Sequence, residues 1–213
     1  LAARKQNFND RFPFSDENRA TVASMLRDGG YRTAMVGKWH LGFDRGAAGK
    51  EKGLGFDHAK PITGGPVDRG FDSFFGMHAS LDIPPYFYLR DRAATKAPTE
   101  WADANSSVGG KEGWNHIQGA FWREGKISPD FKFAEVTPRF AQEACKVIES
   151  HDDGKPLFLY LALPSPHTPW LPAKEFVGMS GAGMYGDFVM TVDNVVGQVL
   201  ASLEGAGMAK NTL

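Results

Sequence analysis

The sequence has little cysteine, little net charge and no long apolar run. Cys145 is the only cysteine among 213 residues, so no disulfide can form within the chain. Lysine and arginine number 24 against 25 aspartate and glutamate residues, a balance that excludes the strongly basic surface of a nucleic-acid-binding domain. No stretch of about eighteen apolar residues occurs, so the sequence predicts no membrane-spanning segment. The first residues, LAARKQNFND, are charged and lack the pattern of a signal peptide.

The residues that are present suit one globular domain with long loops. Hydrophobic residues make up 42% of the chain, enough for an ordinary core. Glycine and proline concentrate between residues 43 and 130, in stretches such as PITGGPVDRG and LDIPPYFY, which predicts long loops between regular elements. Aromatic stretches such as FDSFFG argue against disorder there. We therefore expect residues 1–213 to form a single domain with a loop-rich insertion at about 43–130.

Hydrophobic periodicity predicts two helices and a strand between them. Residues 15–30 predict a helix that begins near Ser15 or Asp16 and buries an apolar stripe of Val22, Met25 and Leu26. The segment YRTAMVGK follows as a short, β-favouring strand. The segment TPRFAQEACKVIESHDDG predicts a helix capped by Thr137, in which Cys145 is a small buried hydrophobic residue. Its expected buried face consists of Phe140, Ala144, Val147 and Ile148.

Two further segments complete the expected fold. KPLFLYLALP contains seven consecutive apolar residues, 157–163, which predicts a central strand covered by helices on both faces. GMYGDFVMTVDNVVGQVLASLEGAG has helical periodicity and closes at Gly205 and Gly207. Helices that alternate with strands predict an α/β fold with a mostly parallel sheet flanked by helices.

A lysine and a histidine follow the first predicted strand, at the sheet edge where ligands bind in open α/β folds. Residues two apart in extended backbone point to one face, so Lys38 and His40 could both reach one small ligand while Trp39 points into the core. Lysine supplies a positive charge for an anion, and histidine a proton donor or acceptor near neutral pH. The pair predicts half of an anion-binding site.

Two further polar clusters follow predicted strands. His167 lies in LPSPHTP, after the strand at 157–163, where three prolines restrict the backbone and hold the imidazole on a stiff arm. Ser80 follows the apolar run in GFDSFFGMHASLD, with His78 and Asp82 nearby. The sequence shows no partner base for Ser80, so we expect a hydrogen-bond donor rather than a nucleophile. The three clusters together predict a site for an anionic ligand.

Each of these residues also has a plainer interpretation. Taken alone, Lys38 suits a solvated lysine at a strand end, Ser80 a turn residue, and His40 and His167 structural histidines. A zinc site built from His40, His78 and His167 would have suitable ligand types. The adjacent lysine and the lack of HxxxH or CxxC spacing disfavour it, so no metal site is expected within the chain.

The motifs resemble those of the sulfatases, members of the alkaline-phosphatase-like superfamily. YRTAMVGKWHLG resembles a sulfatase signature, DRGFDSFFGMHASLD resembles the family's segment with an active-site serine, and PLFLYLALPSPHTPWLPAKEF resembles its strand and proline-framed histidine. The last helix is similar as well, so the resemblance covers nearly the whole chain and is strongest to the arylsulfatase group. It implies an alkaline-phosphatase-like fold and a sulfuric ester hydrolase that cleaves sulfate monoesters.

The resemblance also implies roles for four residues. Lys38 would contact the sulfate and the oxygen of the nucleophile, and His40 would hydrogen-bond the nucleophile and act as base when sulfate is expelled. Ser80 would donate to a sulfate oxygen. His167 would bind the sulfate and help to protonate the departing alcohol or phenol. Cationic donors and a titratable imidazole suit these tasks, since charge develops on the transferring group and the leaving oxygen.

Other parts of the family's site are not visible in the sequence. The family's nucleophile is a formylglycine made within a C/S-x-P-x-R motif, which does not occur here, and Cys145 lies in an unrelated helix. The family's calcium ligands include an Asp pair and an Asp-Asn or Asp-His pair after a strand, whereas Asp193 and Asn194 fall inside a predicted helix. We therefore expect an interior fragment, inactive alone, whose calcium ligands and formylglycine lie outside it.

Two alternatives to a sulfatase stay open from the sequence. One is a phosphodiesterase or phosphonate monoester hydrolase of the same superfamily, and the other is a non-catalytic homologue that binds anions. The resemblance implies a sulfated small molecule or carbohydrate as substrate. It also implies an exported protein, whether periplasmic, secreted or lysosomal.

Overall fold

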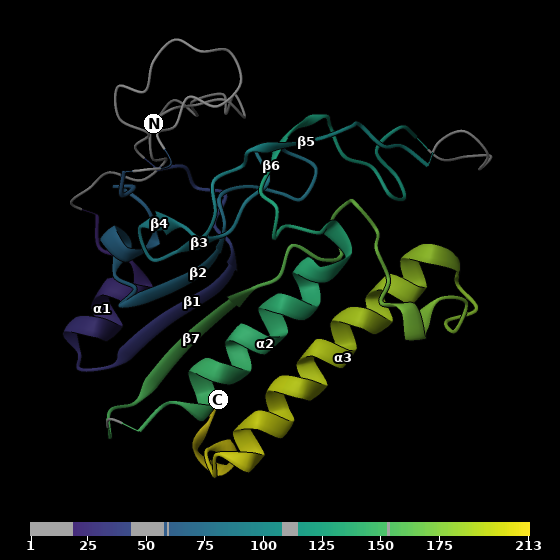
Figure 1. The fold of residues 1–213 in the computed structure, drawn as a ribbon. Helices are drawn as coiled ribbons and strands as arrows, with labels where there is room; N and C mark the ends of the chain where they lie inside the picture. The colour runs from purple at the N-terminus through teal and green to yellow at the C-terminus, as the bar shows by residue number, and fades with distance from the viewer. Residues whose placement is uncertain (1–18, 44–57, 59, 108–114, 153) are drawn as a thin grey trace.

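The computed structural model describes residues 19–43, 58, 60–107, 115–152 and 154–213 (Figure 1). Its centre is a five-stranded sheet of order β4-β3-β2-β1-β7. In it, β1 (Arg32–Lys38) lies parallel to β2 (Ser73–Met77) on one side and to β7 (Leu157–Ala162) on the other. The short strands β3 (Leu89–Arg90) and β4 (Ala93–Ala94) extend the sheet antiparallel beyond β2. The expected α/β architecture with a mostly parallel sheet is confirmed.

Helices cover both faces of this sheet. α2 (Val136–Glu149) packs against one face, and α3 (Gly183–Gly205) lies alongside α2 on its outer side (Figure 1). α1 (Val22–Asp28) packs against the opposite face of β1. Short 3-10 turns occur at η1 (Pro66–Arg69), η2 (Phe133–Glu135), η3 (Lys174–Phe176) and η4 (Ala209–Asn211). A separate two-stranded sheet, β5 (Glu100–Ala102) with β6 (Gly125–Ile127), lies beside the main one.

The apolar strands serve two hydrophobic cores at once. Met35 and Phe74 belong to the core on the α1 side, whereas their neighbours Val36 and Phe75 belong to the core that includes Phe140 of α2. Successive residues of a strand point to opposite faces, so a continuous apolar run fills both cores. Three of the four residues of the expected buried face of α2 are at most 1% exposed: Phe140, Ala144 and Ile148. The fourth, Val147, is partly buried and packs against the same core.

β7 differs from the prediction in its place in the sheet. It pairs with β1 along its length but is the edge strand of the described sheet, not a central one. Its residues are half-buried, and Tyr160 is 49% exposed. The apolar run correctly indicates that both faces of β7 contact hydrophobic layers. It carries no information on strand order, because order depends on contacts between distant segments.

The starts of the helices also differ from the prediction. Ser15 and Asp16 lie outside the described residues, and α1 is capped by Thr21, which accepts from the Ser24 N–H in a capping box. Val22 and Met25 are exposed and Ala23 is buried instead, because Gly70 packs directly against the α1 backbone. The second position of α2 is Thr137, so it does not cap that helix.

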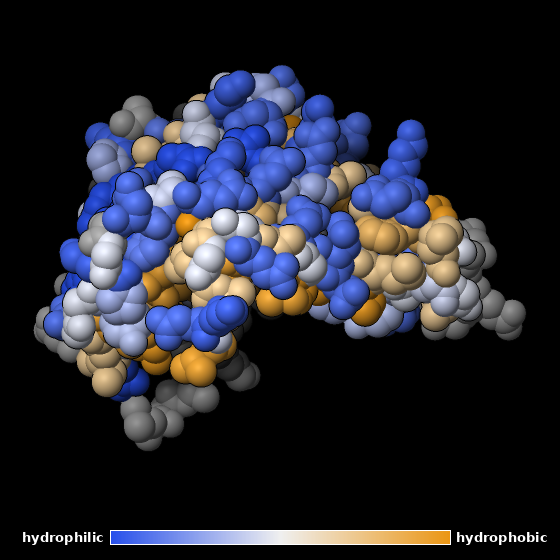
Figure 2. Space-filling model, turned by 90° about the horizontal axis from the view of Figure 1, so that it is seen from below, coloured by the Kyte–Doolittle hydropathy of each residue, from blue (hydrophilic) through white to orange (hydrophobic). Residues whose placement is uncertain are grey.

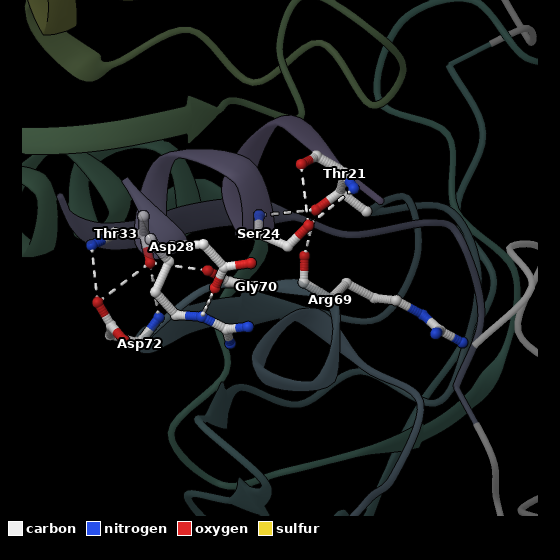
Figure 3. Close-up of polar contacts among 8 residues, drawn as sticks. Thr21, Ser24, Asp28, Thr33, Arg69, Gly70 and Asp72 are labelled. Atoms are coloured by element: carbon white, nitrogen blue, oxygen red, sulfur yellow. Dashed lines mark hydrogen bonds and ion pairs between the residues drawn. The ribbon is translucent and has the colours of Figure 1, made fainter. Parts of the chain in front are cut away.

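Polar contacts fasten α1 and the start of β1 to the segment that precedes β2 (Figure 3). The Thr21 hydroxyl donates to the Arg69 carbonyl at 2.6 Å, and the Thr33 hydroxyl donates to the Gly70 carbonyl at 2.8 Å. The Thr33 N–H donates to Oδ2 of Asp72 at 2.9 Å. These bonds satisfy groups that would otherwise lose water on burial. They fix the amino ends of β1 and β2, and hence the relative position of their carboxyl ends.

α3 contacts α2 on one side and exposes apolar side chains on the other. Phe188 and Val195 are buried, and the Cys145 thiol lies 3.7 Å from the Gln198 carbonyl. Cys145 is half-buried rather than fully buried as expected, because it faces the seam between the two helices. Hydrophobic surface is visible among hydrophilic residues from below (Figure 2). The exposed apolar residues of α3 are Tyr185, Val189, Val196 and Leu200.

No helix among the described residues combines the length and the apolarity that a bilayer crossing demands.

Candidate functional site

Three polar loops meet at the carboxyl edge of the sheet because β2, β1 and β7 are parallel neighbours. Lys38 is the last residue of β1, Ser80 follows β2, and His167 follows β7. The three clusters expected from the sequence are therefore brought to adjacent strands. The central strand carries the lysine and histidine pair, so the serine and the second histidine approach from opposite sides.

Lys38 and His40 do not share a simple extended segment. His40 has φ +56°, in the left-handed region, so the expected side-chain alternation stops there. Trp39 is buried as expected, and its indole N–H donates to the Gly42 carbonyl at 2.6 Å. The backbone N–H of His40 donates to the His78 carbonyl at 3.0 Å. Main-chain bonds to the loop after β2 thus hold His40 in place.

Ser80 lies beside the imidazole of His40. Its side chain is 3% exposed, and its Oγ is 3.4 Å from Nδ1 of His40. The preceding His78 has a structural role, since its Nε2–H donates to the Pro85 carbonyl at 2.8 Å and its ring stacks on Phe87. The zinc arrangement considered from the sequence is not formed. Among the described residues, no three His, Cys, Asp or Glu side chains gather in a metal-binding group.

His167 lies in a loop whose residues on both sides of it form hydrogen bonds to neighbouring segments. Its Nδ1–H donates to the Thr168 carbonyl at 2.7 Å, which leaves the proton chemistry of the imidazole to Nε2. Before it, the Ser165 hydroxyl lies 2.7 Å from that of Thr137 on α2. After it, the Thr168 hydroxyl and the Trp170 N–H both bond the Gly119 carbonyl, at 3.2 and 2.8 Å. The imidazole is exposed while its backbone is anchored.

The electrostatics of the site favour a neutral His40. Burial lowers its pKa from the ordinary value of 6.5, the charges of Lys38 and His167 lower it further, and Asp82 opposes them. Burial also lowers the pKa of Lys38 from 10.5, again against Asp82. A neutral imidazole can accept a proton, and a half-buried ammonium can stabilise an anion more strongly than a solvated one.

The sequence predicts no role for Asp82 or Arg123, although Asp82 lies on the same loop as Ser80. Asp82 is 6% exposed and forms an ion pair with Arg123, whose Nη1 lies 2.5 Å from Oδ2. The position of Asp82, two residues after Ser80, was the one signal available. Nothing in the sequence singles out Arg123, since it lies in the expected loop-rich insertion without a recognisable motif.

A cavity of about 310 Å³ lies at the opposite edge of the sheet. Its lining includes Arg32 at the start of β1, Ser73 at the start of β2 and His151 after α2. A seven-residue strand spans roughly 20 Å, so this cavity is separate from the cluster around Lys38 and His40.

Comparisons of the sequence and of the structure with known proteins both find sulfatases. A family model described as Sulfatase matches residues 3–213. Mouse N-acetylgalactosamine-6-sulfatase is 31% identical over 192 residues, which cover 90% of this chain and 31% of that protein. An N-acetylgalactosamine-6-O-sulfatase of Bacteroides thetaiotaomicron is 29% identical, with 91% of this chain and 41% of that protein covered. The chain thus spans between about a third and two fifths of the length of these curated relatives.

Solved structures share the fold. One, described under the metabolism of multiple glycosaminoglycans by Bacteroides thetaiotaomicron, superposes with a TM-score of 0.71 and 26% identity, over 94% of this chain and 45% of that one. The PsFucS1 sulfatase of Pseudoalteromonas sp. has a TM-score of 0.59 and 20% identity, over 95% of this chain and 38% of that one. The second likeness is evidence for the fold alone.

Proposed function

Because the chain belongs to the sulfatase family, we propose that the whole protein hydrolyses sulfate monoesters as a sulfuric ester hydrolase. Family membership confirms the expected alkaline-phosphatase-like α/β fold. The observation that carries the proposal is the convergence of Lys38, His40, Ser80 and His167 at one edge of three parallel strands. The relatives reported above are named sulfatases, so they do not favour the phosphodiesterase or phosphonate monoester hydrolase alternative.

The cationic and hydrogen-bonding groups of the site would hold the sulfate. The Lys38 ammonium would stabilise the negative charge of the sulfuryl group, and the Ser80 hydroxyl would donate to one of its oxygens. Each interaction strengthens as charge builds on the transferring group, which is how such donors lower a barrier. The partial burial of Lys38 reduces screening by water, so its charge acts more strongly than that of a fully solvated lysine.

The two histidines would divide the proton transfers. His40, kept neutral by burial and by the nearby positive charge of Lys38, would take a proton from the group that expels sulfate. His167 would give a proton from Nε2 to the oxygen of the departing alcohol, because its Nδ1–H is held by the Thr168 carbonyl. A base and an acid on separate loops, on either side of the sulfate, suit one substrate between them.

Sulfatases in general use calcium and a formylglycine nucleophile, and the described residues do not form a calcium site. No group of three or more His, Cys, Asp or Glu side chains occurs among them. Cys145 bonds toward α3 and lies on α2, away from the strand ends that carry the cluster. We propose that residues beyond this chain supply both, and the roles given above depend on neither.

The substrate class that we propose is a sulfated carbohydrate. Two relatives act on N-acetylgalactosamine 6-sulfate groups by name, and a structural neighbour was solved in complex with a neocarrahexaose. The chain is 17% identical to that neighbour, so that likeness supports the fold and leaves the sugar unspecified. By the same family resemblance we propose that the protein acts after export.

The test is turnover of sulfate and phosphate esters by the whole protein. We expect hydrolysis of an aryl sulfate and of a sulfated amino sugar, with kcat reduced roughly 10²–10⁴-fold by Lys38→Ala or His40→Ala. The reason is that each variant removes a group that acts on the transition state.

Matched controls remove the same residue type away from the site. Lys210→Ala, after α3, and His151→Ala, beside the cavity at the opposite edge of the sheet, should leave kcat unchanged. Turnover close to wild type in both Lys38→Ala and His40→Ala, or a preference for phosphate esters, would contradict the proposal.

A further inference from the structure

An ion pair and several hydrogen bonds join the loop after β2 to the loop-rich insertion. The Arg123 guanidinium donates to the Asp82 carboxylate at 2.5 Å and to the Asp82 carbonyl at 3.0 Å. The Arg123 carbonyl in turn accepts from the Tyr86 hydroxyl at 2.6 Å. A neighbouring residue of the insertion, Gly119, holds the His167 arm by two hydrogen bonds. The short segment 119–123 therefore contacts two of the loops that carry the site.

Asp82 is unusual for a residue whose only role is to anchor a loop. It is 6% exposed, and only Oδ2 is used by Arg123. The other oxygen, Oδ1, is buried and has no hydrogen-bond partner among the described residues. A buried carboxylate oxygen without a partner is costly, so it is retained where its charge is useful.

Asp82 lies on the same loop as the candidate site, two residues after Ser80, whose Oγ is 3.4 Å from Nδ1 of His40. From this position its negative charge opposes the lowering of the pKa values of Lys38 and His40 by burial. His167 also acts on His40, and Lys38 and His40 act on one another. Tyr86 faces Asp82 as well, and its pKa is raised by burial and then by Asp82. Arg123, with 52% of its side chain exposed, is the cation that is paired with Asp82.

We propose that Asp82 and Arg123 form a positioning pair for the sulfate site, in which Asp82 balances Lys38 and His40 and Arg123 sets how strongly they experience its charge. The inference rests on the proposed function. A carboxylate next to an anion site repels the substrate unless cations offset its charge; Arg123 pairs with Asp82 directly, and Lys38 interacts with it electrostatically. The pair keeps Lys38 cationic and His40 able to titrate, despite their burial.

The pair predicts pH shifts of opposite sign for its two members. Asp82→Asn removes the negative charge that raises the pKa values of Lys38 and His40. Both residues should therefore titrate at lower pH than in the wild type. Both limbs of the kcat/KM profile of the whole protein should then move to lower pH, by on the order of one unit. Arg123→Gln leaves Asp82 less compensated, so both limbs should move to higher pH.

Two control variants distinguish an electrostatic role of the Asp82–Arg123 pair from a structural one. Arg123→Lys keeps the positive charge and should keep the limbs of the wild-type profile. The double variant with Asp82→Asn and Arg123→Gln should return them toward wild type, because the opposite changes cancel. A merely structural role predicts lower activity in both single variants without a change in the limbs. That result, or shifts in the same direction, would overturn the inference.

A direct titration keeps the test independent of turnover. The His40 pKa can be followed by NMR in the whole protein with ¹³C-labelled histidine, assigned by the loss of one signal in His40→Ala. We expect a lower value in Asp82→Asn and a higher one in Arg123→Gln. If the protein hydrolyses no sulfate ester, the proposed function fails while these titrations still decide the role of the pair. Unchanged His40 values in both variants would refute it.

Discussion

Lys38 and His40 have altered proton affinities because of where β1 ends. Burial lowers both pKa values, and the nearby carboxylate of Asp82 opposes the change. The opposing effects leave a cation and a neutral imidazole side by side at neutral pH. His167 differs, because its ring is exposed and its backbone is fixed by bonds to neighbouring segments. At the scale of the residue, the site combines shielded charges with one accessible proton donor.

The role of His167 can be tested through the leaving group. We expect His167→Ala to lower kcat at least tenfold more for an unactivated sugar sulfate than for an activated aryl sulfate. A poor leaving group needs a proton from Nε2, whereas a stable phenolate does not. Steady-state kinetics on both substrates with the whole protein measure the difference.

The comparison variant for this prediction is Lys38→Ala. It should reduce both rates by similar factors, because Lys38 contacts the sulfate that the substrates share. Equal losses on both substrates in His167→Ala would exclude a proton-donor role for His167.

The parallel strands approach each other most closely at two glycines. Gly37 of β1 has φ +125°, and a Cβ there would collide with the carbonyl of Ala162 on β7. A Cβ on Gly76 of β2 would collide with the carbonyl of Gly37. At the scale of the element, these positions bring three backbones together just before Lys38. The spacing of the site therefore depends on residues without side chains.

The close approach predicts a large effect of a single methyl group. We expect Gly37→Ala to reduce the free energy of unfolding by about 2–4 kcal/mol, because the backbone conformation is strained for alanine and β7 must move away. Urea unfolding followed by circular dichroism measures the change.

Gly197 provides a matched control within α3. Apart from its own helix, no atom of the described residues lies within 4 Å of the position of its Cβ, so Gly197→Ala should stabilise the protein by up to about 1 kcal/mol through helix propensity. Equal effects of the two substitutions would contradict the packing at Gly37.

Glu143 links the helical layer to the sheet. Its carboxylate, 6% exposed, accepts from Arg90 of β3 at 2.8 Å and from Lys146 of α2 at 3.2 Å. Burial raises its pKa, but the hydrogen bonds and charges of Arg90 and Lys146 outweigh burial and hold the pKa below its ordinary value of 4.5. At the scale of the molecule, one buried carboxylate contributes to cohesion between α2 and β3 of the sheet.

The lowered pKa predicts a contribution to acid sensitivity. Folding favours ionised Glu143, so its stabilisation is complete well above pH 4.5 and is lost as the pH falls through the lower folded-state pKa. Glu143→Gln should lower stability at pH 7 and reduce the slope of stability against pH below 4.5. Thermal unfolding as a function of pH measures both effects.

Glu204→Gln is the control for this prediction, because Glu204 is exposed at the end of α3. It should leave both the stability at pH 7 and the acid slope unchanged. An unaltered slope in Glu143→Gln would show that the link between the layers has no electrostatic component.

The sequence by itself determined the elements and the residue types at their ends. Apolar periodicity is a local property, so the strands at 32–38 and 157–162 and the buried face of α2 could be predicted. The prolines around His167 and the lysine at the end of β1 were likewise visible as motifs. Boundaries were less accurate, as for Thr137, because capping depends on which side chain reaches the free backbone groups.

Only the tertiary structure decided how these elements meet. It placed β7 at the edge of the described sheet, turned His40 out of extended backbone and brought Arg123 to Asp82 across 41 positions of sequence. Such contacts form between segments whose patterns are independent of one another, so no local pattern records them. The chemistry of single residues was readable in the chain, whereas the balance of charge around Lys38 and His40 arises from packing.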